Sequence, residues 1–184
     1  MSRKNYSFLQ MNGPAGSDDP LTKLIEGHAC NIGKLMGNLH SFECLLRIFL
    51  TKHNKQTEDG FDAKIGTFVA ITHLTSYDSL KELILKFNAI VKDKFPELEL
   101  LSGVVHIRDA IAHGRFFTSH PSKPMQLFKY SKPQKGDRNV EVKFAVIMTP
   151  EWFVTELSAV LQEMAKVVEA TRLMGFDLNL HSHG

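Results

Sequence analysis

An arginine and a histidine five residues apart, Arg108 and His113, are the residues of this chain best suited to chemistry. They lie in the segment 104–115, an apolar helical pattern that runs up to Gly114. Histidine can accept and donate a proton near neutral pH, so it suits acid–base catalysis. Asp109 precedes His113 by one helical turn, where its carboxylate would orient the imidazole and favour its protonated form. We therefore take Arg108, Asp109 and His113 as candidate catalytic residues.

Arg108 is unusual because its helical neighbours are apolar. The surrounding arc contains Leu98, Leu100, Leu101, Val104, Val105, Ile107, Ile111 and Ala112. A buried, unpaired guanidinium costs several kcal/mol or more, so Arg108 must be paired or must line an interface or cleft. His113 projects about 140° away from Arg108 around the helix. A left-handed cap at Gly114, where the backbone turns, and the length of the arginine would let the two side chains approach.

A structural role for the same residues is the alternative, and it is the commoner arrangement. Glu43 lies at the edge of the apolar stripe of the first expected helix and is the best carboxylate partner for Arg108. His113 would then only interact with the negative end of the helix dipole. An Arg and a His at fixed spacing do not by themselves decide between the two interpretations.

The elements that must position these residues are mainly helical. We expect a single domain over 21–175, with a flexible leader at 1–20 and a flexible tail at 176–184. Apolar residues at three- and four-residue steps predict four helices. Their expected ranges are 21–52, about 77–95, 97–113 and 149–174. Thr75 or Ser76 would cap the second helix, and Thr149 followed by Pro150 would start the last.

A β-hairpin at about 125–148 is expected before the last helix. Alternating apolar residues predict strands at 125–130 and 140–148, joined by a basic turn-forming loop. The segment 61–74 is ambiguous between helix and strand, and we favour a helix because helices flank it. The predicted fold is thus a bundle of four to five helices with an inserted hairpin.

Composition excludes several functional classes. The net charge of +2 does not by itself indicate nucleic-acid binding, although six basic residues fall within 121–143. Cys30 and Cys44 lack CxxC spacing, which argues against a disulfide framework or structural zinc site and favours a reducing, cytoplasmic compartment. No apolar run approaches the roughly 20 residues of a membrane helix. Phosphate-binding loop, dinucleotide and Ser–His–Asp motifs are absent from the sequence.

The residues 108–113, Arg-Asp-Ala-Ile-Ala-His, resemble the motif of the HEPN superfamily (higher eukaryotes and prokaryotes nucleotide-binding). In that family a histidine stands at the fifth position after an arginine, at the end of a helix in a small helical bundle. The Gly-Arg that follows looks like many bacterial members. The resemblance covers the domain at 21–175, and only the motif corresponds residue by residue.

The resemblance implies a metal-independent endoribonuclease that needs no cofactor. Many such proteins are toxins or antiphage defence effectors, and they work as homodimers with two motifs facing each other. An antitoxin or another protein partner is therefore implied as well. In the implied reaction the ribose 2′-OH attacks the adjacent phosphate and leaves a 2′,3′-cyclic phosphate.

The resemblance also implies a role for each residue of the motif. His113 would move the proton, Arg108 would stabilise the charge of the phosphorane, and Asp109 would orient His113. Four basic residues would hold the RNA backbone: Arg115, Lys132, Lys135 and Arg138.

The chain departs from the family pattern at two positions. Asp109 stands where asparagine is common, and an acidic group is less favourable beside a phosphate. Arg115 stands where some members have a tyrosine, so no phenol is available there. Other HEPN proteins act as non-catalytic adaptor, dimerisation or nucleotide-binding modules, and this is the alternative function.

Overall fold

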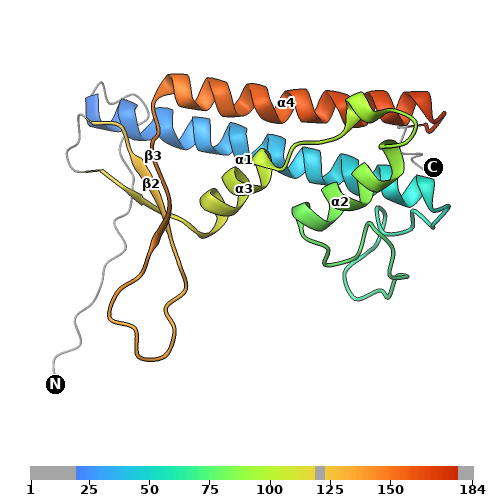
Figure 1. The fold of residues 1–184 in the computed structure, drawn as a ribbon, viewed down its shortest axis with the longest axis horizontal. Helices are drawn as coiled ribbons and strands as arrows, with labels where there is room; N and C mark the ends of the chain where they lie inside the picture. The colour runs from blue at the N-terminus through green and yellow to red at the C-terminus, as the bar shows by residue number, and fades with distance from the viewer. Residues whose placement is uncertain (1–19, 119–122, 178–184) are drawn as a thin grey trace.

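The computed structural model describes residues 20–118 and 123–177. They form four α-helices, one short 3-10 helix (η1) and one small antiparallel sheet (Figure 1). The elements in chain order are α1 (Pro20–His53), α2 (Leu80–Val91), η1 (Pro96–Leu98), α3 (Gly103–His113), β1 (Arg115–Phe117), β2 (Gln126–Tyr130), β3 (Val142–Ile147) and α4 (Pro150–Leu173). The helical character and the hairpin before the last helix are confirmed, whereas the three-stranded sheet makes the fold mixed rather than purely helical.

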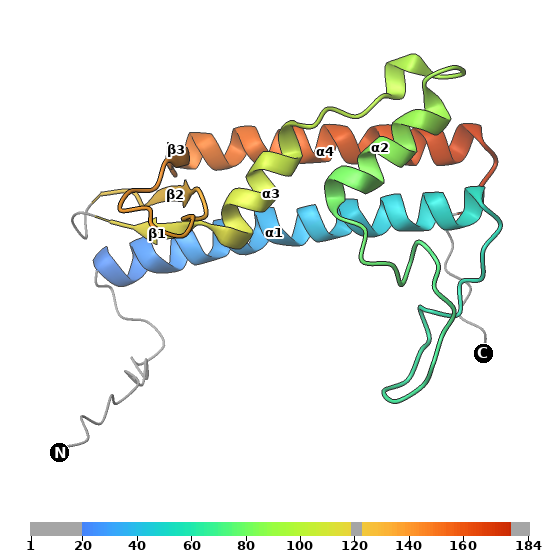
Figure 2. The same ribbon diagram turned by 60° about the horizontal axis from the view of Figure 1, so that its bottom comes forward.

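The core lies along α1, which packs lengthwise against α4 (Figures 1 and 2). Both helices run in the same direction, away from the sheet. The apolar stripe of α1 is at most 1% exposed at Leu35, Leu39, Phe42, Leu46 and Phe49. Gly27, Gly33 and Gly37 do not interrupt the helix, because its packing outweighs the roughly 1 kcal/mol that each glycine costs. No described helix has the length and apolarity needed to cross a bilayer.

Helix starts follow local capping chemistry. Thr149 caps α4 as expected, because its hydroxyl accepts a hydrogen bond from the Trp152 amide at 3.2 Å. The prediction of Thr75 or Ser76 as the cap of α2 is wrong. Ser79 takes this position and forms a capping box with Glu82. Thr75 and Ser76 instead support the preceding turn, where Thr75 Oγ1 accepts a hydrogen bond at 2.9 Å from the Thr72 amide.

The predicted helix over 97–113 is divided in the structure. η1 ends at Leu98, and α3 begins only at Gly103. The side chain of Asn88 binds both backbone groups of Leu100, at 2.8 and 2.9 Å. Glu163 of α4 accepts a hydrogen bond from the Leu101 amide at 2.9 Å. These side chains replace the helical backbone partners, so the helix breaks between its two expected halves.

The preference for a helix at 61–74 is also wrong. This segment forms turns and irregular backbone between α1 and α2. Its large apolar side chains at Ile65, Phe68 and Ile71 are 107%, 103% and 88% exposed, so it lacks the buried face that would stabilise a helix.

The two ends of the chain lie largely outside the described residues. Residues 1–19 and 178–184 are outside the described ranges, and they include most of the expected leader and tail. Phe176 is an exception within the expected tail, because its ring lies 5.7 Å from that of Phe49 and packs on the core. Ordered packing therefore continues past residue 175.

The sheet has the strand order β1-β2-β3, and all pairs are antiparallel. β2 and β3 are the two strands of the expected hairpin, whereas β1 was not expected. Leu127 of β2 is fully buried, and the next residue on the same face, Lys129, reaches α3. Phe128 and Tyr130 alternate with them and lie on the opposite face.

Candidate functional site

α3 presents the three motif residues at the end of the helix next to the sheet. The Asp109 and His113 side chains are 38% and 63% exposed, and Arg108 is half-buried. Among residues 20–118 and 123–177, no group forms an ion pair or accepts a hydrogen bond from Arg108. The guanidinium therefore keeps its donors available, as an anion-binding arginine requires.

Glu43 does not support Arg108 and has a different partner. Its carboxylate pairs with Arg47, one turn further along α1, at 2.8 Å. Arg47 also donates hydrogen bonds to the backbone oxygens of His73, Ser76 and Asp78 at 2.9, 3.0 and 2.7 Å. The structural arginine of this fold is thus Arg47, which fastens the connection after α1. The expected pair between Glu43 and Arg108 is therefore wrong.

Asp109 connects α3 to the sheet. Its carboxylate accepts a hydrogen bond from Lys129 of β2, and its Oδ1 lies 3.7 Å from Nε2 of His113. The hydrogen bond from Lys129 holds the pKa of Asp109 below its usual value, with smaller contributions from His113 and Arg108. Asp109 is therefore an anion at neutral pH that faces the imidazole. The two side chains thus lie close together, and the orienting role of Asp109 stays a prediction.

Gly114 ends α3 for a reason other than the expected left-handed cap. Its φ of −80° and ψ of 179° are extended backbone that any residue adopts. A Cβ at this position would lie 2.2 Å from the Ala110 oxygen and 2.5 Å from Cδ1 of Leu127. Glycine is needed because β2 packs directly against the helix end. The prediction of a helix end at Gly114 is confirmed, and the predicted backbone conformation is wrong.

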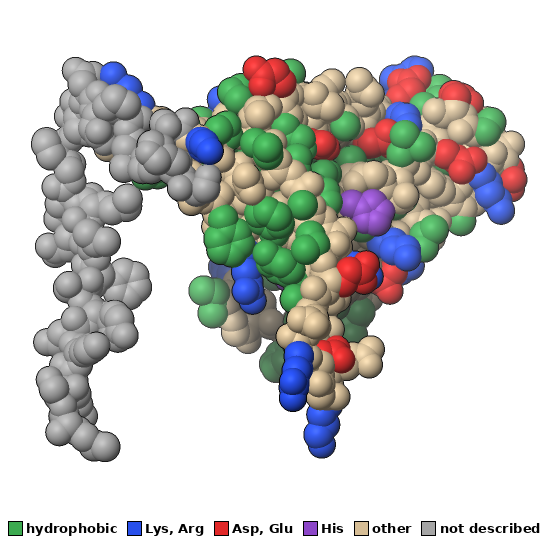
Figure 3. Space-filling view, turned by 60° about the vertical axis from the view of Figure 1, so that its left-hand side comes forward, with side chains coloured by type: hydrophobic (Ala, Val, Ile, Leu, Met, Phe, Trp, Pro, Cys, Tyr) green, Lys and Arg blue, Asp and Glu red, His purple; other side chains and the backbone are tan. Residues whose placement is uncertain are grey.

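The four expected RNA-binding cations fall into two places. Arg115 begins β1, and its guanidinium carbon lies 5.7 Å from the centre of the Tyr130 ring. The hairpin loop extends beyond the helices (Figure 1). It carries the other three cations, all exposed: Lys132, Lys135 and Arg138. Figure 3 shows Lys and Arg side chains at its tip, below a group of hydrophobic side chains. Only Arg115 therefore lies next to the motif.

Sequence reasoning missed Lys129 and the aromatic residues of the sheet. Lys129 was counted only among the basic residues of the hairpin, yet it contacts Asp109. Phe117 and Phe128 form a ring pair at 5.9 Å on the face opposite Lys129. The alternation Leu127-Phe128-Lys129-Tyr130 could have indicated a strand with two different faces. The ring pair could not be predicted, because Phe117 lies on β1, a strand that was not expected.

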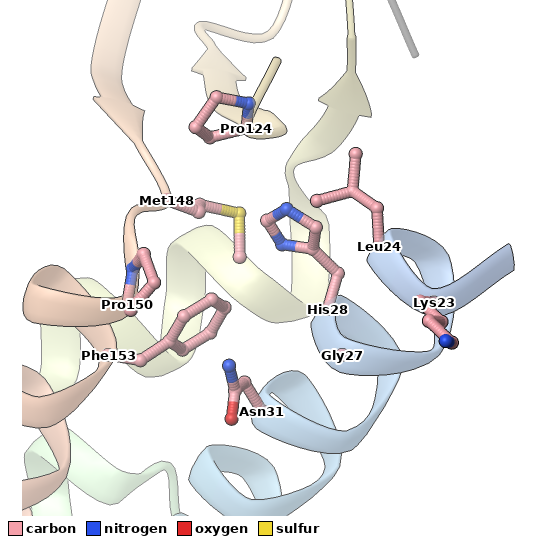
Figure 4. A pocket seen from close by; sticks show the side chains of 9 residues that line it. All are labelled: Lys23, Leu24, Gly27, His28, Asn31, Pro124, Met148, Pro150 and Phe153. Carbon is pink, nitrogen blue, oxygen red and sulfur yellow. The ribbon is translucent and has the colours of Figure 1, made fainter. Parts of the chain in front are cut away.

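Two pockets lie away from the motif. One, of about 160 Å³, separates the start of α1 from the start of α4, and the His28 ring points into it near Met148 and Leu24 (Figure 4). The other, of about 200 Å³, includes Glu43 and Arg47. Within the described ranges, no three His, Cys, Asp or Glu side chains are grouped to hold a metal ion.

Comparisons with known proteins add no relative. No family model, no curated protein and no solved structure matches this chain.

Proposed function

We propose that this protein is a metal-independent endoribonuclease of the HEPN type. The observation that carries the proposal is the arrangement at the end of α3. An exposed imidazole lies 3.7 Å from the anchored carboxylate of Asp109, and Arg108 on the same helix has no partner among the described residues. Acid–base transfer and anion binding are the two functions that phosphodiester transesterification requires.

In the proposed reaction His113 either takes the proton from the ribose 2′-OH or delivers one to the departing 5′ oxygen, and water makes the other proton transfer. The O2′–P bond forms as the P–O5′ bond breaks, which leaves a 2′,3′-cyclic phosphate and a 5′-OH end. Arg108 donates hydrogen bonds to the non-bridging oxygens, whose charge grows in the phosphorane. Asp109 keeps the imidazole oriented while Lys129 balances the charge of that carboxylate.

The HEPN-like assembly and its setting belong to the same proposal. Two copies would place their α3 ends face to face, and Ala112 and His113 are exposed at that end. Cys30 and Cys44 are free and exposed, which supports a reducing, cytoplasmic setting. A role as a toxin or antiphage effector, and an antitoxin partner, rest on the motif resemblance alone.

A non-catalytic adaptor is the second candidate. The connection between α1 and α2 favours it, because Ile65, Phe68, Ile71 and Tyr77 all expose large apolar side chains. Apolar groups exposed together are typical of protein-interaction surfaces. An adaptor would bind a partner there and would leave RNA intact.

Cleavage of single-stranded RNA in EDTA separates the two candidates. The ribonuclease cleaves and leaves cyclic phosphate ends, and both Arg108→Ala and His113→Ala abolish the reaction. His40→Ala, at an exposed position on α1, is the matched control and should cleave like the wild type. Cleavage that survives in both α3 variants would refute the proposal.

A further inference from the structure

We propose that the outward face of the sheet is a stacking site for the unpaired bases of a single-stranded nucleic acid. Four residues of β1 and β2 form it: Arg115, Phe117, Phe128 and Tyr130. The inference deepens the proposed ribonuclease function by giving the substrate strand a binding surface. Binding of a single strand to this face does not depend on the ribonuclease proposal. Only the statement that the natural strand is RNA rests on it.

The side of the sheet follows from strand alternation. Leu127 is fully buried and Lys129 reaches Asp109, so these residues face the helices. Phe128 and Tyr130 must therefore face away from them. The register pairs Arg115 directly with Phe128, which places both on the outward face.

The aromatic rings on this face are continuous. The ring centres of Phe117 and Phe128 are 5.9 Å apart, and those of Phe128 and Tyr130 are 6.2 Å apart with planes within 13°. Phe117 remains 47% exposed although it contacts Phe128. Phe128 and Tyr130 are half-buried, so part of each ring is accessible. Every base offers a π face, and accessible aromatic rings bind single strands with little sequence preference. Arg115 over Tyr130 adds a cation that can stack on a base or bind a phosphate.

The positive charge of the hairpin loop next to this face favours a polyanion as the ligand. Three exposed cations of the hairpin loop have no partner among the described residues: Lys132, Lys135 and Arg138. Of the two acidic side chains nearby, Glu141 pairs with Lys143, and Asp137 is a single carboxylate against these three cations. A row of rings that continues into unpaired cations matches bases linked by phosphates.

The stacking face also lies next to the proposed catalytic residues. Arg115 follows His113 by two residues, a length of chain that spans at most about 7 Å. A strand bound over Tyr130 and Arg115 would therefore continue past the end of α3. This places the scissile phosphate at one end of the stacked bases.

Binding to uncleavable strands tests the inference apart from cleavage. The full chain is titrated by fluorescence anisotropy into a labelled single-stranded oligothymidine and into an abasic deoxyribose-phosphate oligomer of equal length. We expect the double variant Phe128→Leu/Tyr130→Leu to bind oligothymidine about fivefold or more weakly. Its affinity for the abasic strand should not change. Lys132→Gln/Lys135→Gln should weaken both strands, because it removes phosphate contacts.

Two control variants keep the result interpretable. Phe68→Leu makes the same change at a fully exposed ring outside the sheet and should bind like the wild type. Tyr130→Phe keeps a ring and should retain binding. Unchanged affinity in the double variant, an equal loss for both strands, or a changed oligomeric state without a changed affinity would each overturn the inference. RNA cleavage without base-dependent binding would refute the stacking site alone, and base-dependent binding without cleavage would refute the ribonuclease alone.

Discussion

Oδ1 of Asp109 lies 3.7 Å from Nε2 of His113, one helical turn away, while the same carboxylate binds Lys129 of β2. The sheet therefore helps to set where the carboxylate faces the imidazole. A helix end alone would leave this contact to a freely rotating aspartate. Here the hydrogen bond from a neighbouring strand restrains it.

We expect Asp109→Asn to destabilise the fold modestly, and only where the carboxylate is charged. Lys129 lowers the pKa of Asp109 in the folded state. A carboxyl group whose pKa is lower in the folded protein than in the unfolded chain, where it is about 4, stabilises the fold above that unfolded pKa. This contribution disappears as the pH falls. The loss should be about 0.2–1 kcal/mol at pH 7 and should shrink towards pH 3, as measured by urea denaturation. Asp62→Asn, at an exposed position, is the control.

Gly114→Ala should destabilise the protein by about 1–3 kcal/mol or more. The new methyl group would lie 2.2 Å from the backbone oxygen of Ala110, which cannot move without disturbing α3. Gly37→Ala is a sharp control because nothing lies within 4 Å of the added Cβ in the middle of α1. That change should stabilise by about 0.5–1 kcal/mol. If thermal unfolding shifted both variants in the same direction, one of the two expectations would be contradicted.

Arg47→Ala should cost on the order of 3 kcal/mol, because it leaves Glu43 and three backbone oxygens without their donor. Its side chain is 14% exposed, so water does not readily replace it. Limited proteolysis should then cut the connection 54–79 first. Arg172→Ala removes an exposed Arg–Glu pair on α4 and should change stability little. Equal protease resistance in both variants would argue against the anchoring role of Arg47.

His28 should make stability pH-dependent near neutrality. Burial lowers the pKa of His28, and its Nε2 accepts a hydrogen bond from the Met125 amide at 3.4 Å. The pKa of such a histidine is lower in the folded protein than in the unfolded chain, where it is about 6.5. Its contribution to the stability of the fold is complete above that unfolded pKa and is lost as the pH falls. The melting temperature should therefore fall between pH 7 and 5. His28→Gln keeps an acceptor that cannot titrate and should flatten this dependence, whereas His40→Gln should not.

Local sequence signals predicted much of the fold. The apolar stripe of α1, the Thr149 cap of α4 and the alternation in β3 each act within a few residues, so they could be read directly. The break before α3 depends on Asn88 and Glu163, which are distant in sequence from Leu100 and Leu101. The helical pattern at 97–113 is continuous and carries no sign of these partners, so it predicts one helix where the structure has η1 and α3.

The candidate site shows the same limit. The spacing of Arg108, Asp109 and His113 could be read from one helix, and the structure places Asp109 beside His113 as expected. The partner of Glu43 and the contact of Lys129 depend on the packing of separate elements. Gly114 could be recognised as a helix end. Glycine is required there because neighbouring atoms leave no space for a Cβ, and not because of its backbone angles.

The parallel packing of α1 and α4 has a consequence for synthesis on the ribosome. α1 is made first, yet the helix that covers much of its apolar stripe comes from 150–173 at the other end of the chain. Until those residues emerge, Phe42, Leu46 and their neighbours can bury only part of their surface. Contacts so distant in sequence form slowly because a long loop must close first. The nascent chain thus keeps part of the apolar face of α1 exposed until α4 has been synthesised.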